Sequence, residues 1–143
     1  MIRLTAAITT ALATAVAIGA GHAFAADPIS KPDHVAPGCR ARANSSACTI
    51  ALRYLAALDL DRAREACSLL EPETLEAAGG MARCVKTLSA ARGIRIRYSI
   101  LEVHYSPFGR TVVFSTRAGS RAPIRQAMIV TRRGRILAIA PVP

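Results

Sequence analysis

The apolar residues of this chain change their spacing at Gly93, and this change limits the fold more than any other feature of the sequence. Before Gly93 they recur every three or four positions, which is the period of an amphipathic helix. After it, Ile94, Ile96 and Ile100 alternate with polar residues, which is the period of a strand. Helices that are followed by strands, instead of alternating with them, indicate an α+β domain.

The helical part is predicted to contain three helices. Ser46 is a good N-cap residue for the first, and Asp61 can cap the second. Pro72 favours the start of one further helical turn, and Gly79-Gly80 ends that turn. The expected helical ranges are 47–58, 62–70 and 81–92, with the extra turn over 72–78.

The second part is predicted to form four antiparallel strands in sequence order. The alternation changes parity at Ile100-Leu101, which indicates a β-bulge that bends the first strand. Gly- and Pro-containing turns separate the expected strands, which cover 94–105, 111–117, 124–131 and 136–142. We therefore expect three N-terminal helices packed on one face of a curved four-stranded antiparallel sheet.

The first 25 residues have the pattern of a signal peptide. Arg3 precedes an uncharged run over 4–20, and Ala23-Phe24-Ala25 is a small-x-small cleavage pattern. We expect cleavage after Ala25 and a secreted or extracytoplasmic protein; the alternative is an uncleaved N-terminal membrane anchor. The predicted organisation is a signal peptide at 1–25, an extended arm at 26–46 and one domain at 47–143.

Four cysteines predict two structural disulfides in a short exported chain. Three pairings are possible. Cys67 and Cys84 lie on the apolar faces of consecutive predicted helices, so antiparallel packing would bring them together. The remaining pair, Cys39 and Cys48, would then fasten the arm to the first helix. The chain has no C-x-x-C spacing, and neither His34 nor His104 completes a ligand set, so we expect no metal.

Positive charge is concentrated after residue 80. Residues 81–143 contain twelve basic side chains and Glu102 as the one acidic side chain, whereas residues 26–80 contain six basic and eight acidic ones. This asymmetry permits binding to an anionic polymer or lipid surface; the competing interpretation, which we favour, is a solvated arginine-rich sheet surface. Aromatic residues are scarce, so nucleic acid is not an expected partner. The candidate anion-binding residues are Arg95, Arg97, Arg117, Arg125, Arg132 and Arg133.

Three segments together resemble a known family. They are a first helix with an Ala-x-x-Tyr-Leu-x-Ala-Leu pattern over 51–58, the segment Glu65 to Leu70 with Cys84 in the next helix, and the final hairpin from Met128 to Ile139. This combination is similar to the small secreted NTF2-like (SnoaL-like, cystatin-like) domains of high-GC bacteria. The resemblance implies a cone in which helices and a curved sheet enclose a pocket.

The inward strand face of such a cone would be largely apolar in this chain. The candidate pocket residues are Tyr54, Ile96, Tyr98, Ile100, Val103 and Tyr105. No residue matches a catalytic position of the family, and we expect no cofactor. The leading hypothesis is therefore a non-catalytic exported domain that binds a small apolar ligand or a protein.

Two further hypotheses are open. Glu102 and His104 are two positions apart on one strand face, which would suit an acid/base pair in a small enzyme; the competing interpretation is an ordinary exposed surface. Leu137 and Ile139 are expected on the face opposite Ile136 and Ala138, where they would favour a homodimer through the sheet.

Overall fold

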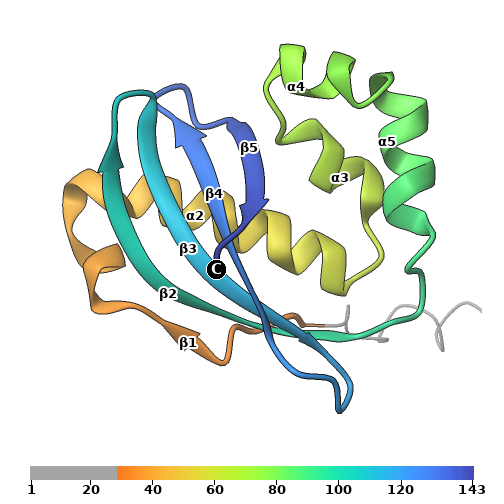
Figure 1. Ribbon diagram of the computed structural model, residues 1–143, viewed down its shortest axis with the longest axis horizontal. Coiled ribbons are helices and arrows are strands. Elements are labelled where there is room, and N and C mark those ends of the chain that lie inside the picture. Colours follow the sequence, from red (N-terminus) through yellow and green to blue (C-terminus); the bar gives the residue numbers. More distant parts are fainter. Residues whose placement is uncertain (1–28) are drawn as a thin grey trace, which may run out of the picture.

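The computed structural model describes residues 29–143, so the predicted signal peptide and its cleavage site lie outside the described residues. Figure 1 shows helices and strands following one another as the change of period predicts. The elements are β1 (His34–Val35), the 3₁₀ turn η1 (Pro37–Arg40), α2 (Arg42–Asp59), α3 (Ala63–Ser68), α4 (Pro72–Ala77), α5 (Gly80–Ser89), β2 (Ile96–Ser106), β3 (Gly109–Ala118), β4 (Ile124–Thr131) and β5 (Ile136–Pro141).

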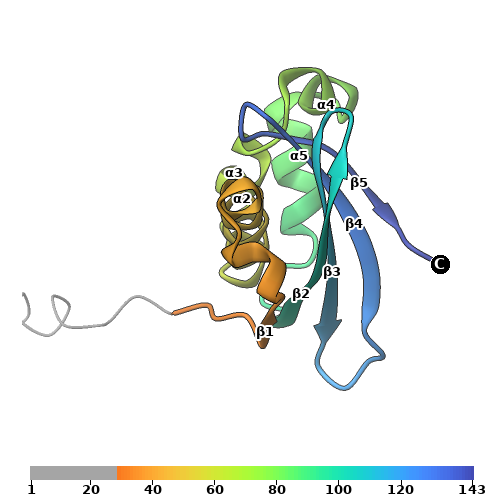
Figure 2. The ribbon, with the colours of Figure 1, turned by 90° about the vertical axis from the view of Figure 1, so that its left-hand side faces the viewer.

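The sheet and the helices form two layers. Within the described residues the sheet has five strands in the order β1-β2-β3-β4-β5. Strands β2 to β5 form an antiparallel meander, and β1 adds to its edge in parallel with β2. Figure 2 shows the helices of residues 29–143 on one side of the sheet, and no described element covers the other side, which we call the open face. The α+β prediction is confirmed, with one strand and one helix more than expected.

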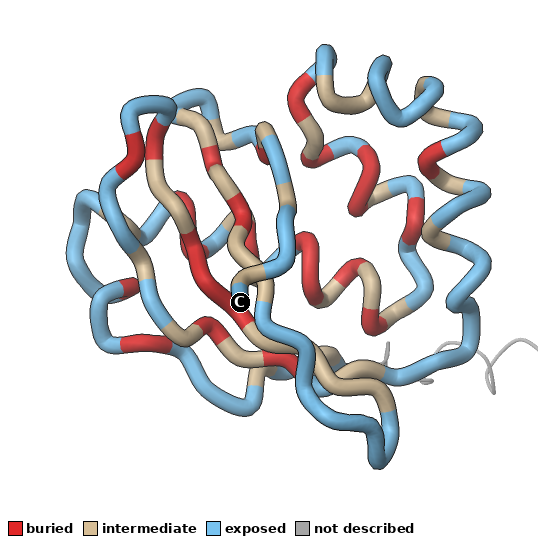
Figure 3. Tube along the Cα trace, viewed as in Figure 1, coloured by how far each residue is buried: buried red, intermediate tan, exposed pale blue. Residues whose placement is uncertain are grey.

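The core lies between α2 and the middle of the sheet. Leu55 of α2 is fully buried, as are Ile100, Val112 and Met128 on the strands. Phe114 of β3 is 1% exposed and has the largest side chain of this group. These residues come from the apolar stripe of the helix and from alternate positions of the strands, so the periodicity correctly predicts the core. Figure 3 shows the buried positions in red along these facing surfaces.

The bulge in β2 is confirmed at its predicted place. The β2–β3 register shifts between Ile100 and Glu102, so residues on either side of the shift reverse their parity. A second register shift, between Ile129 and Val130, was not predicted. Because of it, Ile136 and Ile139 both lie toward the helices: Ile136 is fully buried, and Ile139 packs against the core. The prediction that they lie on opposite faces was wrong.

Both disulfides pair as predicted. Cys67 of α3 is bonded to Cys84 of α5, and Cys39 of η1 is bonded to Cys48 of α2. Cys48, Cys67 and Cys84 are all buried. The apolar faces of the predicted helices could therefore be used to predict which cysteines pair. Two disulfides are typical of proteins that fold outside the cytoplasm.

The N-terminal boundary of the first helix was predicted wrongly. α2 begins at Arg42, and its N-cap is the extended residue Ala41, so Ser46 lies inside the helix. The chain turns into this helix directly from η1, and the Asn44 side chain donates a hydrogen bond to the carbonyl of Gly38. The arm is therefore more regular than expected, because β1 pairs with Ser99 and Ile100 of β2.

Asp61 does not cap α3. The N-cap of that helix is Arg62, without a side-chain hydrogen bond. Asp61 has a left-handed backbone with φ of 56°, and both of its carboxylate oxygens accept from the Gly93 amide at 3.0 Å. It therefore stabilises the turn that leads into β2, a contact between segments 32 residues apart.

Candidate functional site

An apolar cavity, which we call the main cavity, lies between the helices and the inner face of the sheet. Its volume is about 380 Å³, which falls within the usual range for small-molecule sites. Most of its lining is apolar and comes from α2, the end of α5 and strands β2 to β5. The residues that form it include Tyr54, Leu55, Leu58, Leu88, Ile94, Ile96, Phe114, Thr116, Ala118, Gln126 and Ile139.

A second hollow of about 390 Å³ adjoins this cavity. The two hollows share Tyr54, Thr87, Leu88 and Ile139, so the apolar surface extends along α5 toward Ala78, which follows α4. The lining of the main cavity also includes polar groups, among them Ser89 and Arg92. The lining is therefore mostly apolar, with a few polar groups.

Local sequence explains how these side chains reach the cavity. On β3 the alternate residues Phe114, Thr116 and Ala118 point toward the helices. On α2, Tyr54 and Leu58 are four positions apart and therefore lie on the same face. Burial raises the pKa of Tyr54, so its phenol stays neutral and can act as a hydrogen-bond donor or acceptor.

The predicted pocket residues divide into two groups. Tyr54 and Ile96 line the main cavity. Tyr98 and Ile100 are buried in the core beneath α2, at 2% and 0% exposure. Val103 packs near Gly38, and Tyr105 is 69% exposed beside Arg110. α2 packs against β2, and Tyr98 and Ile100 belong to the core that these two elements share.

Sequence reasoning missed the contributions of α5, β3 and β5 to the cavity. The signal was present in the alternation Phe114, Thr116 and Ala118 and in the apolar positions of the third predicted helix. It indicated an inward face, but it did not indicate which inward residues α2 would cover. The cavity lies where α2 ends and the sheet continues.

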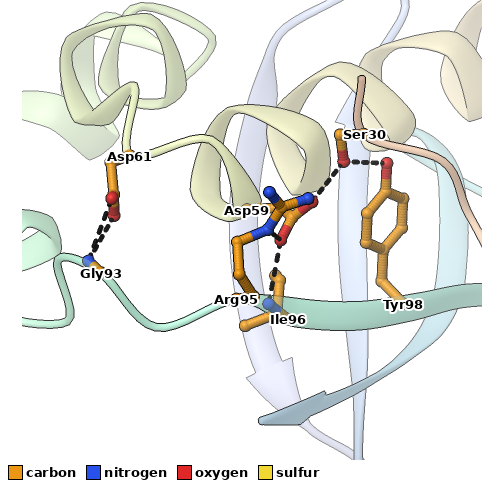
Figure 4. A network of polar contacts seen from close by, with 7 residues as sticks. All are labelled: Ser30, Asp59, Asp61, Gly93, Arg95, Ile96 and Tyr98. Carbon is orange, nitrogen blue, oxygen red and sulfur yellow. Dashed lines mark hydrogen bonds and ion pairs between the residues drawn. The ribbon is translucent and has the colours of Figure 1, made fainter. Parts of the chain in front are cut away.

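A polar network surrounds Asp59, at the end of α2 (Figure 4). Oδ1 of Asp59 accepts from Arg95 Nε at 2.8 Å and from the Ile96 amide at 3.0 Å. Oδ2 accepts from Arg95 Nη2 at 2.9 Å and from Ser30 Oγ at 2.8 Å. Ser30 Oγ is also 2.8 Å from the Tyr98 hydroxyl. Four bonds therefore occupy a carboxylate that is 4% exposed.

This network fixes the charge of Asp59. Burial alone would raise its pKa, but hydrogen bonds from Arg95, Ser30 and Ile96 outweigh burial, and the pKa is lowered. The pKa of Arg95 is raised, because the same hydrogen bond favours its charged form. Arg95 is thus engaged in holding the end of α2 to the start of β2.

The other predicted anion-binding arginines lie in two separate places. Arg97, Arg117 and Arg125 lie on the open face of the sheet, where Arg97 pairs with Asp33 and Arg125 with Glu102 at 2.8–2.9 Å. Arg132 and Arg133 are exposed in the β4–β5 turn at the opposite end of β4.

The Glu102 and His104 pair lies on the open face of the sheet, outside the cavity. Their side chains are 46% and 57% exposed, and His104 Nε2 is 2.8 Å from Glu102 Oε2. Arg125 Nη2 donates to the other carboxylate oxygen. The hydrogen bond to His104, together with Arg125, lowers the pKa of Glu102. Because Glu102 is held ionised in contact with solvent, this geometry favours a surface ion pair.

Residues 29–143 contain no group of three His, Cys, Asp or Glu side chains arranged to hold a metal ion. Within the same range, no helix is long and apolar enough to span a membrane.

Comparison with known proteins gives a limited result. No protein-family model matches the chain. No curated protein matches it either. Among solved structures, the chain is similar to an NTF2-like protein of unknown function from Cytophaga hutchinsonii ATCC 33406. The two are 13% identical, with a TM-score of 0.42, over 63% of this chain and 82% of the other.

Proposed function

We propose that this protein is an exported, disulfide-stabilised and non-catalytic domain that binds a small apolar molecule between its helices and its sheet. The observation that supports the proposal is the apolar cavity of about 380 Å³. An apolar cavity with a few polar groups in its lining is the usual form of a small-molecule site. We further propose that the fold is a member of the NTF2-like cones, which the sequence resembles.

Export is part of the proposal. It is supported by the signal-peptide pattern at 1–25 and by the two disulfides. The alternative ligand is a segment of a partner protein, because the apolar surface extends along α5 beyond the main cavity. An apolar small molecule fits better, because seven elements of the fold, α2, α3, α5 and β2 to β5, contribute to the lining.

The experiment measures binding of a neutral fluorescent probe, N-phenyl-1-naphthylamine, to the protein purified with both disulfides formed. Ala118→Trp adds a large side chain inside the cavity. We expect it to weaken probe binding roughly tenfold or more, since the added ring takes up space that the probe needs. Ala140→Trp is the matched control, because Ala140 is an exposed strand residue outside the cavity lining.

Thermal unfolding of both variants shows whether they are folded at the temperature of the titration. Wild-type protein that fails to bind the probe, or equal binding by wild type and Ala118→Trp, would overturn the proposal. Native mass spectrometry of freshly purified protein provides an independent measurement, because a copurified apolar ligand adds its mass to the folded chain.

A further inference from the structure

Two turns lie side by side at one end of the sheet. The β2–β3 turn contains Pro107 and Phe108, and the β4–β5 turn contains Arg132 and Arg133. Gly109 pairs with Thr131, so the two turns emerge from neighbouring strands (Figure 1). This approach is close: a Cβ at Gly109 would lie 2.1 Å from the Val130 carbonyl oxygen. We call Tyr105, Phe108, Arg110, Arg132 and Arg133 the hairpin end.

The hairpin end exposes two aromatic side chains. Tyr105 is 69% exposed and Phe108 is 62% exposed. The turn between β2 and β3 needs residues such as Pro107 and Gly109, but its geometry does not need phenylalanine. Figure 3 shows this turn as an exposed projection of the sheet. Phe108 therefore presents an apolar ring to the surroundings without contributing to the core.

An arginine lies beside one of these rings. The Arg110 guanidinium lies 5.4 Å from the centre of the Tyr105 ring, and its Nε donates to Asn44 Oδ1 in the first turn of α2. The start of α2, with exposed Arg42, is therefore part of the same surface. Arg132 and Arg133 extend it across the neighbouring turn.

Among the described residues, no carboxylate forms an ion pair with Arg110, Arg132 or Arg133, whereas Arg97 and Arg125 at other positions are paired. Glu71, the acidic residue nearest the β4–β5 turn by contact, is buried and accepts from the Thr131 hydroxyl at 2.7 Å. The exposed Glu73 and Glu76 belong to α4, which contacts β5, and neither forms an ion pair with an arginine of the hairpin end. The hairpin end is thus positively charged.

We propose that the hairpin end docks onto the surface of an anionic lipid bilayer. Phe108 and Tyr105 enter the boundary between headgroups and acyl chains, and the arginines contact the lipid phosphates. Aromatic rings next to basic residues suit this boundary, because it combines apolar volume with negative charge. An anionic polymer would satisfy the arginines but offers no apolar layer for Phe108.

The test uses the absence of tryptophan from the sequence. Phe108→Trp places a single reporter at the tip of the β2–β3 turn, and Ile124→Trp places one at a comparably exposed site, 60%, at the other end of β4. Vesicles of phosphatidylcholine with an equal share of phosphatidylglycerol are added to each protein. We expect a blue shift and quenching by brominated lipid in the Phe108→Trp variant alone, and no change in either variant with vesicles of pure phosphatidylcholine.

Co-sedimentation with the same vesicles measures affinity. We expect Phe108→Ser and the pair Arg132→Ser with Arg133→Ser each to weaken binding roughly tenfold or more, whereas Arg121→Ser in the β3–β4 turn leaves it unchanged. Failure of wild-type protein to bind at low salt, or equal fluorescence responses of the two tryptophan variants, would overturn the proposal. So would binding to a soluble polyphosphate that is as tight as vesicle binding and insensitive to Phe108→Ser.

Discussion

Asp59 connects three segments that are far apart in the sequence. Its carboxylate joins the end of α2 to Arg95 and Ile96 at the start of β2 and to Ser30 in the arm. If this buried carboxylate is protonated, it can no longer accept a hydrogen bond from every one of these donors. The hydrogen bonds that remain are also weaker, because hydrogen bonds to a charged group are stronger than those to a neutral one. The stability of the junction therefore depends on the ionised form of one side chain.

We expect Asp59→Asn to lower the free energy of unfolding by about 2–3 kcal/mol, because the amide can accept at one atom only and places an NH₂ group opposite Arg95. Urea unfolding followed by circular dichroism measures this loss. Asp33→Asn is the matched control: Asp33 binds Arg97 at the surface, with 39% of its side chain exposed, and its loss should cost about 0–1 kcal/mol. Equal effects of the two variants would contradict this account.

The lowered pKa of Asp59 gives a pH dependence with a definite sign. Its stabilising contribution is complete above the pKa of an unfolded aspartate, about 3.9, and is lost as the pH falls through the lower pKa of the folded state. The difference in unfolding free energy between wild type and Asp59→Asn should therefore be largest near neutral pH and shrink below about pH 4. A difference that stays constant down to about pH 2 would show that Asp59 acts without its charge.

The sequence indicated which single residues matter at the end of the first helix better than it indicated their hydrogen-bond partners. It predicted the end of the first helix to within one residue, at 58, but it assigned Asp61 as a cap for the next helix. Arg95 and Gly93, the partners of these carboxylates, lie more than thirty positions away. Local rules cannot select between a nearby backbone amide and a distant one, because the choice depends on how the chain returns.

The bond between Cys67 and Cys84 links α3 to α5, two helices of six and ten residues. Helices this short are marginal without tertiary contacts. The bond closes a loop of 17 residues and restricts the unfolded chain, so its stabilising effect does not depend on the packing around it alone.

Replacing both Cys67 and Cys84 with serine should lower the free energy of unfolding by about 3 kcal/mol in the chain-entropy model. Replacing Cys39 and Cys48, which are separated by nine positions, should cost about 2.5 kcal/mol. Hydrogen exchange will distinguish the two variants: we expect faster exchange in α3 and α5 for the first and in η1 and the start of α2 for the second. The same pattern of exchange in both variants would contradict this separation.

Helices and strands with a regular spacing of apolar residues were predictable. A β-bulge in a strand was predictable only where the alternation of apolar and polar residues changed parity. The β2 bulge was visible because Leu101, Val103 and Tyr105 follow Ile100 with reversed parity. In the last hairpin, apolar residues occupy both faces of β5. Because they do not alternate with polar residues, the sequence from Ile136 to Ile139 gives no change of parity from which the bulge could be predicted. The homodimer prediction relied on that parity. It remains a prediction, now without this support.

The molecule as a whole carries a net charge of +10 at pH 7. Some arginines form ion pairs, such as Arg97 with Asp33. Most basic residues cannot be paired, because the chain has 19 Lys and Arg but only 9 Asp and Glu. Self-repulsion of like charges destabilises a compact state, and salt screens it within a Debye length. Repulsion should therefore outweigh the few surface ion pairs.

We expect added sodium chloride, up to physiological ionic strength, to raise the Tm by roughly 3–5 °C, which corresponds to about 1 kcal/mol for a domain of this size. Scanning calorimetry at low and moderate salt measures the shift. A variant with Arg117, Arg121 and Arg133 changed to glutamine should shift less, because fewer like charges remain. A Tm that falls with salt would mean that the ion pairs dominate.

The cavity shows why function was harder to predict than fold. Alternation along the strands predicted an apolar inner face, and that face exists. Whether a given inner residue contacts a helix or an open space depends on where α2 ends relative to the sheet. Tyr98 and Ile96 are two positions apart on the same face, yet one is covered by the core and the other lines the cavity.

The two edges of the sheet determine how readily this chain could pair with strands of another molecule. Unpaired edge strands can add a strand from another molecule and so begin aggregation. Here β1 covers part of β2, while Ile136 exchanges backbone hydrogen bonds with Leu69 and Glu71, and the Leu137 carbonyl accepts from Thr74. Pro141 and Pro143 follow at the end of β5. The short segments flanking the sheet thus protect its edges from intermolecular β-pairing.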